Sequence, residues 1–129
     1  MMQSPAIDIK DMIVAAGLGV FGTTLHIASM PDTPDLCIAV YDIAGLSAEL
    51  NYDWQRPAVQ VQVRGKAGVY TDAHAKITAI SALLHGKQET RGGAVYKLIQ
   101  QEGDISHVST DDTRRPLLTT RFQIQRTAA

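Results

Sequence analysis

The residues of this sequence that could do chemistry form four groups: a glycine-rich run, scattered histidines, a serine beside a histidine, and clustered charges. The run Gly17-Leu18-Gly19-Val20-Phe21-Gly22 has the G-x-G-x-x-G spacing of dinucleotide-binding loops. Such a loop needs a strand before it and a helix after it, so that the pyrophosphate meets a helix N-terminus. Here a helical pattern precedes the glycines and a strand pattern follows them. We therefore expect a turn and no nucleotide site.

The histidines show no metal-binding pattern. His26, His74, His85 and His107 are spread over the chain, whereas metal ligands usually come in closely spaced pairs. One alternative is a cation site in an acidic loop, where His107, Asp104 and the pair Asp111-Asp112 would converge. Acidic loops of this kind are more often simply solvated. We expect no metal and no cofactor.

Enzymatic nucleophiles and bases are equally poorly organised. Ser106 precedes His107, but a nucleophile and its base must approach in space, which adjacency in sequence does not supply. The chain has no G-x-S-x-G elbow. Glu49 and Asp53 could form a carboxylate pair, as residues in any surface loop could. The sequence predicts a protein that is not an enzyme.

The charges argue against nucleic acid as a specific partner. The chain has 12 basic and 13 acidic residues, a formal charge of −1, and aromatic residues make up only 5%. Nucleic-acid binders usually show a basic excess and stacking aromatics. Arg114-Arg115 beside Asp111-Asp112 is interpreted as a self-compensating cluster, with a phosphate clamp as the alternative. Cys37 lies in an apolar run and is expected to be a buried side chain without reactivity.

The length and the apolar pattern predict one domain over residues 1–129, without a signal peptide or a membrane span. We expect the protein to be soluble and to be made in a cytoplasm.

Two helices are expected to position these groups. The first covers residues 8–16, where apolar side chains recur at helical spacing and Asp8 can cap the N-terminus. The second covers residues 71–85, with Thr71 as the cap and Gly86 as the end. Its apolar stripe consists of Tyr70, Ala73, Ile77, Ile80 and Leu84.

Strands are expected at 24–28, 36–41, 57–65, 95–100 and 117–126. The order of the elements predicts an α+β fold, a mostly antiparallel four- to five-stranded sheet with two helices packed on one face. The other face would then expose long polar side chains. These are Gln60, Gln62, Arg64, Arg121, Gln123 and Gln125.

Two long loops, 42–56 and 102–116, are expected between these strands, and long loops in small domains are often functional. The first contains Tyr52 and Trp54. They are interpreted as a lid over the edge of the core or, alternatively, as an anchor for a partner, since both residue types are favoured interface hot spots.

Several segments together resemble a family of phage minor capsid or tail-terminator-like proteins. The resemblance rests on Pro31 to Ile38 leading to Val40-Tyr41-Asp42, and on the run Arg56 to Gly65. Ile7-Asp8-Ile9 at the first helix, Leu84-His85-Gly86 and Arg115-Pro116 fit as well, in the same order. Fold and family analogy alone does not establish the role.

The resemblance implies a structural virion protein of a long-tailed phage. Tail terminators form a ring, usually of six subunits, on the last ring of the tail tube, stop its growth and face the neck proteins. The family has no catalytic residues and no cofactor. The implied partners are further copies of the chain, the tail tube protein and a neck or head-completion protein, with DNA passing through the ring. The implied location is the tail or neck of the virion, after assembly in the host cytoplasm.

The surface of such a ring subunit is expected to include both long loops and the polar sheet face. The candidate interface residues are Tyr52, Trp54, Arg56, Gln60, Gln62, Arg64, Asp111, Asp112, Arg114, Arg121 and Gln123. Two other functions stay open. One is a head-to-tail joining or stopper protein of the neck, and the other is a small cellular protein-binding domain.

Overall fold

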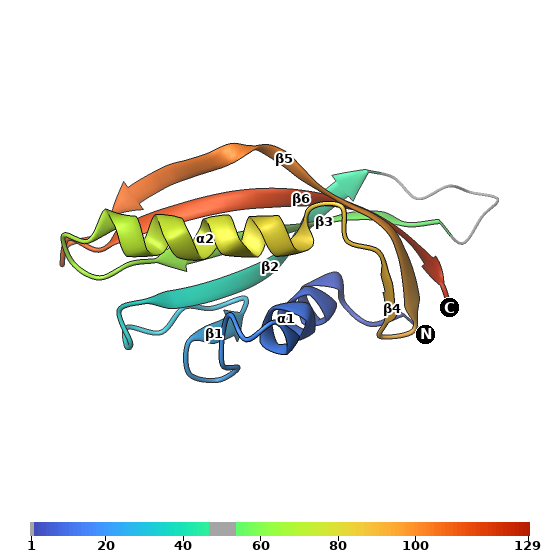
Figure 1. Ribbon diagram of the computed structural model, residues 1–129, viewed down its shortest axis with the longest axis horizontal. Coiled ribbons are helices and arrows are strands. Elements are labelled where there is room, and N and C mark those ends of the chain that lie inside the picture. The colour runs from blue at the N-terminus through green and yellow to red at the C-terminus, as the bar shows by residue number, and fades with distance from the viewer. Residues whose placement is uncertain (1, 47–53) are drawn as a thin grey trace.

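The computed structural model describes residues 2–46 and 54–129, which form two helices and a mixed, curled sheet (Figure 1). The helices are α1 (Pro5–Ala15) and α2 (Tyr70–Leu84). The strands are β1 (Leu25–Ile27), β2 (Cys37–Leu46), β3 (Arg56–Arg64), β4 (Glu89–Arg91), β5 (Ala94–Thr110) and β6 (Pro116–Ala128). The α+β class is confirmed.

The sheet differs in detail from the expected one. It has six strands in the order β1-β2-β3-β6-β5-β4, and β1 pairs with β2 in parallel while the other pairs are antiparallel. Four to five mostly antiparallel strands were expected, so the strand number was too low. The strand that sequence reasoning missed, β4, has only three residues and too little pattern to be recognised.

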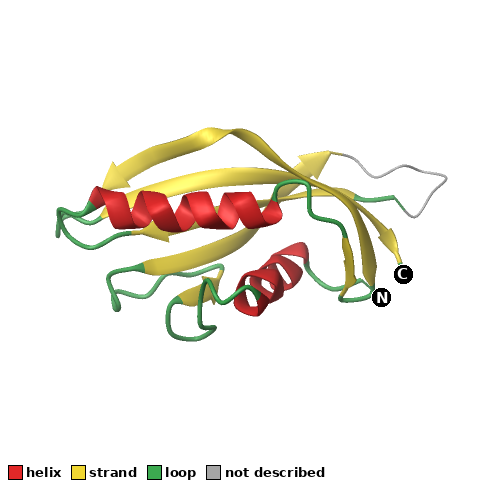
Figure 2. Cartoon of the chain, in the orientation of Figure 1, coloured by secondary structure: helices red, strands yellow, loops and turns green. Residues whose placement is uncertain are grey.

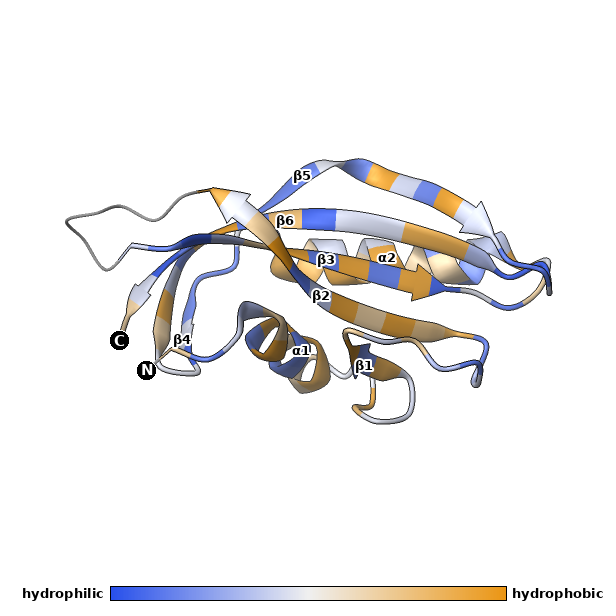
Figure 3. Ribbon diagram, turned by 180° about the vertical axis from the view of Figure 1, so that it is seen from behind, coloured by the Kyte–Doolittle hydropathy of each residue, from blue (hydrophilic) through white to orange (hydrophobic). Residues whose placement is uncertain are grey.

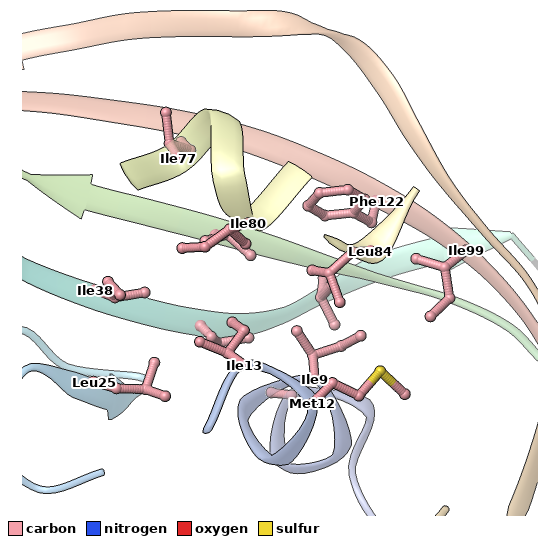
Figure 4. Packing of buried hydrophobic residues seen from close by; sticks show 14 of the residues in the cluster. Ile9, Met12, Ile13, Leu25, Ile38, Ile77, Ile80, Leu84, Ile99 and Phe122 are labelled. Carbon is pink, nitrogen blue, oxygen red and sulfur yellow. The ribbon is translucent and has the colours of Figure 1, made fainter. Parts of the chain in front are cut away.

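Both helices lie on one face of the sheet, as expected (Figure 2). The odd-numbered valines of β3, Val59, Val61 and Val63, point towards them and are fully buried. From α1 the core receives Ile9, Met12 and Ile13, and from α2 it receives Ile77, Ile80 and Leu84 (Figure 4). The apolar faces of the two helices therefore cover one side of the sheet. Tyr70, expected in the stripe of α2, is instead 46% exposed at the start of the helix.

The start of α1 differs from the expectation. The helix begins at Pro5, because proline fits the first helical position, where its missing N–H is not needed. Asp8 is not the cap but lies fully buried within the first turns. The cap comes from β2, where the Asp42 carboxylate accepts bonds from the Ser4 hydroxyl at 2.5 Å and the Ala6 N–H at 2.9 Å.

The glycine-rich run is a turn, as its context indicated. It follows α1 and precedes β1, and Gly17 and Gly22 have φ values of 74° and 86°, which favour glycine. The end of α2 at Gly86 (φ 79°) also agrees with the sequence, whereas its N-cap residue is Val69 and not Thr71.

Both expected long loops contain strand residues in their described parts. In the first, β2 continues to Leu46 and β3 begins at Arg56, with residues 47–53 outside the described part. In the second, β5 continues to Thr110 and forms a long hairpin with β6. Only residues 111–115 form the connection. The register of this hairpin shifts between Glu102 and Ser106, which bends β5.

Candidate assembly interface

Most of the candidate interface residues lie on two regions: the sheet face opposite the helices, and the ends of the long strands. Gln60 and Gln62 of β3 and Arg121 of β6 are half-buried on the sheet face, as expected from strand alternation. Figure 3 shows this face in front, with blue segments along β3 and β6. Tyr52 lies outside the described residues.

Arg64 is on this face, but its side chain is bonded within the subunit. Only 7% of the residue is exposed, and its guanidinium donates to the carbonyls of Asp35 at 3.1 Å, Pro31 at 2.6 Å and Pro34 at 2.9 Å. A buried charge is stable only when its hydrogen bonds are made, as they are here. Arg64 therefore holds the turn before β2.

Gln123 is also buried, at 8% exposure. Its side-chain amide donates to the carbonyls of Arg56 at 2.9 Å and Pro57 at 3.0 Å. These bonds tie β6 to the beginning of β3, where Arg56 itself is half-buried. Gln123 thus has a structural role in the subunit and does not form an outward surface.

Arg121 crosses β3 on the outside of the sheet. Its Nε lies 2.7 Å from a Glu102 carboxylate oxygen and its Nη2 donates to the Ala44 carbonyl at 3.0 Å. Its charge is therefore compensated within the chain. With Arg64 and Arg121 engaged, the described middle of the face presents mainly neutral amides and hydroxyls, namely Tyr41, Gln60, Gln62, Thr119 and Gln125.

The charged dipeptides Asp111-Asp112 and Arg114-Arg115 lie in the turn between β5 and β6, at one end of the molecule. Asp111 accepts bonds from the Arg115 backbone N–H at 2.8 Å and from the Arg115 Nε at 2.7 Å. The backbone N–H of Arg115, then Thr113 and the Arg115 side chain, lower the pKa of Asp111 to about 2. The self-compensating interpretation of Asp111 with Arg115 agrees with this geometry. Asp112 and Arg114 remain exposed.

Arg115 joins this turn to the turn before β2. Its side chain is 9% exposed, and its guanidinium donates to the Asp32 carbonyl at 2.6 Å and the Asp32 carboxylate at 2.8 Å, with Asp35 at 3.4 Å. The two turns are 83 residues apart in the chain at Asp32 and Arg115. Sequence reasoning placed Arg115 in a charge cluster but did not identify this long-range contact, which no local pattern encodes.

A second polar cluster lies at the other end of the sheet and was not anticipated. The Asp8 carboxylate is fully buried, accepts a short hydrogen bond from the Tyr96 hydroxyl, and lies 3.6 Å from Arg126 Nη1. Burial, followed by the bond to Asp8, raises the pKa of Tyr96. Gly92 (φ 60°) passes so close that an added Cβ would lie 2.1 Å from an Asp8 oxygen.

Arg126 extends this cluster to the start of β3. Its Nε donates to the Gln55 side chain at 3.0 Å, and the backbones of Gln55 and Arg126 exchange two hydrogen bonds. Next to Gln55, Trp54 is 40% exposed, and Leu46 at the end of β2 is 59% exposed. Trp54 is therefore a partly exposed aromatic side chain next to the backbone bridge between Gln55 and Arg126.

The candidate carboxylate pair Glu49 and Asp53 lies outside the described residues, and the described groups that suggested metal binding do not form a site. Within residues 2–46 and 54–129, no three or more His, Cys, Asp or Glu side chains lie close enough to hold a metal ion. His107 bonds Thr110 at 3.0 Å, and Asp111 is occupied by Arg115, so the proposed acidic cation loop is not assembled. Burial raises the pKa of the Cys37 thiol, which agrees with an unreactive core position. Neither α1 nor α2 has the length and apolarity needed to cross a membrane.

The structure also reveals exposed apolar side chains that the sequence analysis did not single out. Val20 and Phe21, in the turn after α1, are 61% and 54% exposed, and Val108 of β5 is 52% exposed. They lie at opposite edges of the sheet, beside β1 and on β5.

Comparison with known proteins gives two kinds of match. The family model described as bacteriophage tail terminator protein matches residues 12–128. A solved chain from the virion of a native gene transfer agent particle has the same fold, with a TM-score of 0.78, 12% identity, and coverage of 97% of this chain and 96% of that one. A second solved structure matches with a TM-score of 0.61, 14% identity, and coverage of 98% and 92%. No curated protein sequence matches the chain.

Proposed function

This chain belongs to the bacteriophage tail terminator family, and we propose that it acts by closing into a ring of six subunits on the last ring of the tail tube. As a member of that family it is a structural tail terminator protein of the phage particle. The observation that carries this function is the family match over residues 12–128, which includes every strand of the sheet. The role is assembly and not catalysis.

The two ends of the long strands suit the contacts along the tail axis. One end carries the turns at 31–35 and 111–115, joined by Arg115, and the other end carries Leu46 and Trp54 (Figure 1). Each end is held by a buried guanidinium, Arg115 at the first and Arg126 at the second. One end would contact the tail tube protein and the other a neck or head-completion protein, with Trp54 as an anchor.

The neutral sheet face suits the channel of the ring. DNA that leaves the head would pass this surface, and each cation that binds a phosphate adds affinity that slows passage. Amides and hydroxyls offer few such contacts, because the guanidinium groups of Arg64 and Arg121 are already bonded within the subunit. In this arrangement the ring contacts DNA without recognising its sequence.

A joining or stopper protein of the neck is the second candidate, because such proteins also form rings. A tail terminator and a joining protein differ in the length of the tails that form when the protein is absent. Deleting the gene should give overlong tails if the protein terminates the tube, and complementation with the wild-type gene should restore their length. Free tails of normal length would instead indicate a joining protein.

A small cellular binding domain, the other alternative from the sequence, is not favoured by any observation, because the family match is to a tail terminator protein. Such a domain would remain monomeric and bind one partner in a defined ratio, and its gene could be removed without changing the tails. The overlong tails described above would therefore exclude it.

A further inference from the structure

The two outer edges of the sheet have different surfaces, and this difference bears on how a ring would close. At one edge, β4 pairs only with residues Ala94–Tyr96 of β5. The connection after α2 bonds the next part of β5, through the Gly86 N–H to the Ile99 carbonyl at 2.7 Å and the Gln101 N–H to His85 Nδ1 at 3.1 Å. Within the described residues, no strand lies along the outer edge of β5 beyond that point.

The open part of β5 runs beside α2 and forms a groove with it. The Tyr70 ring lies 6.0 Å from both the His74 ring and the His107 ring, measured between centroids, and so bridges the helix and the strand. A hollow beside these rings is lined by Gly68, Tyr70, His107 and Pro116, and another along α2 is lined by Asp104 and Ile105. We call Tyr70, Asp104, Ile105, His107 and Val108 the β5 flank.

The opposite edge presents a protruding apolar surface. Phe21 is 54% exposed and Val20 is 61% exposed, and the Lys10 ammonium lies 4.4 Å above the Phe21 ring. Val14, one helical turn after Lys10 on the same side of α1, is 40% exposed. We call Lys10, Val14, Val20 and Phe21 the α1 flank.

The two flanks are complementary in shape and in apolar character. The β5 flank is hollowed, carries aromatic rings and includes the exposed Asp104 carboxylate. The α1 flank offers an exposed aromatic ring and two exposed valines, while its Lys10 ammonium is already paired with the Asp11 carboxylate at 2.6 Å. Isolated exposed apolar residues are ordinary, but two complementary groups at opposite edges of one sheet suit a head-to-tail contact.

We infer that the ring closes by docking the α1 flank of one subunit into the β5 flank of the next copy of this chain. This inference rests on the proposed ring and specifies its lateral contact. Because the flanks are different surfaces, each subunit uses one towards each neighbour, and the contact repeats until the ring closes. A standard interface covers about 800 Å² per partner, so both contacts would take about a quarter of the 6687 Å² surface of the subunit.

Two complementary variants test this contact. In the first, Val20→Glu and Phe21→Glu place charges on the α1 flank only. In the second, Tyr70→Glu and Val108→Glu place charges on the β5 flank only. All four side chains are at least 46% exposed, so the subunits should keep their fold, which circular dichroism and melting curves check. Ala79→Glu, at an exposed position of α2 outside both flanks, is the matched control.

Native mass spectrometry gives the decisive result. Each variant alone should form no ring, with subunit affinity lowered about 30-fold or more, and the control should assemble like the wild type. An equal mixture at high concentration should give a dimer with one copy of each variant and nothing larger, because only one intact contact remains. The assignment of the two flanks to the lateral contact would be overturned if either variant alone formed rings as the wild type does. It would also be overturned if the mixture gave no such dimer.

The same samples separate this inference from the proposed function. If wild-type protein forms rings and the flank variants also do, only the assignment of the contact is wrong. If wild-type protein forms no oligomer, either alone or on isolated tails, the ring proposal itself is wrong and the lateral contact falls with it.

Discussion

Arg126 Nη1 lies 3.6 Å from the Asp8 carboxylate, and the two side chains are 6% and 0% exposed. The pair joins the first helix to the last strand, which are separated by almost the whole chain. Arg126 also bonds the Gln3 carbonyl at 2.7 Å and the Gln55 side chain at 3.0 Å. One buried cation therefore fixes three segments at the end of the sheet where β2 and β3 are connected.

Removing one partner of this pair should strongly destabilise the fold. Asp8→Ala leaves the Arg126 guanidinium buried without its counter-charge, which typically costs about 3–5 kcal/mol. We expect the free energy of unfolding, measured by chemical denaturation, to fall by that amount. The control is Glu102→Ala, which breaks the half-exposed pair with Arg121 and should cost less than about 1 kcal/mol. Equal effects of the two substitutions would contradict a structural role for the buried pair.

Asp111 should make the stability of the protein sensitive to acid. Its pKa is lowered to about 2 from 3.8, so the folded state binds the proton less readily than the unfolded state. Its stabilising contribution is therefore complete above about pH 4 and is lost as the pH falls through about 2. Melting curves of Asp111→Asn should show a smaller loss of stability over this range than wild-type curves. The neighbouring substitution Asp112→Asn, at an exposed position, is the control. Identical acid profiles for Asp111→Asn and the wild type would refute the prediction.

Trp54 should matter more for assembly than for folding. It is 40% exposed, so Trp54→Ala removes a large aromatic surface at a modest cost to the core. We expect binding to isolated tails to weaken about 10-fold or more, while the melting temperature changes by only a few degrees. A lower melting temperature with unchanged tail binding would instead support the interpretation of Trp54 as a lid.

The neutral sheet face should be sensitive to added positive charge. If it lines the channel, Gln60→Lys with Gln62→Lys would create a ring of cations and cause salt-dependent binding of linear duplex DNA. The control is Ala75→Lys with Ala79→Lys, which adds the same charge at exposed positions of α2, on the other side of the sheet. Fluorescence anisotropy at low salt measures the binding. Equal DNA affinity of the two variants would show that the sheet face does not line the channel.

The parts of the fold with a clear period could be predicted from the sequence. The alternating valines of β3 and the apolar stripe of α2 each bury one face, and both elements lie where the pattern indicated. Beyond Gln101, β5 lacks such a pattern because this part of the strand is largely exposed on both sides. Its strand conformation depends on pairing with β6, which is a tertiary contact and not a local preference.

The end of β2 escaped prediction for a related reason. Gly45 suggested a loop, but it lies in a strand at a register shift, where an added Cβ would be 2.2 Å from the Arg56 carbonyl. Glycine allows this close approach of two backbones. The glycine therefore indicated an unusual backbone position, but the sequence did not show whether this was a loop or a close approach of two strands.

Arg64 and Gln123 show what strand alternation alone does not reveal about the polar sheet face. Alternation correctly placed both on the face opposite the helices, but long polar side chains can bond backbone carbonyls and become buried. For Arg64 these carbonyls are about 30 residues away in the chain. The sequence indicates the face of a strand residue, whereas its hydrogen-bond partners depend on the complete fold.

The most direct test of the ring is native mass spectrometry of the purified protein over a range of concentrations, alone and with isolated tails. The account predicts a six-subunit particle. The fraction of the protein found in this particle should rise with protein concentration or when tails are added. A mass that stays at one subunit under every condition, with no protein retained on the tails, would contradict the ring and the function proposed from it.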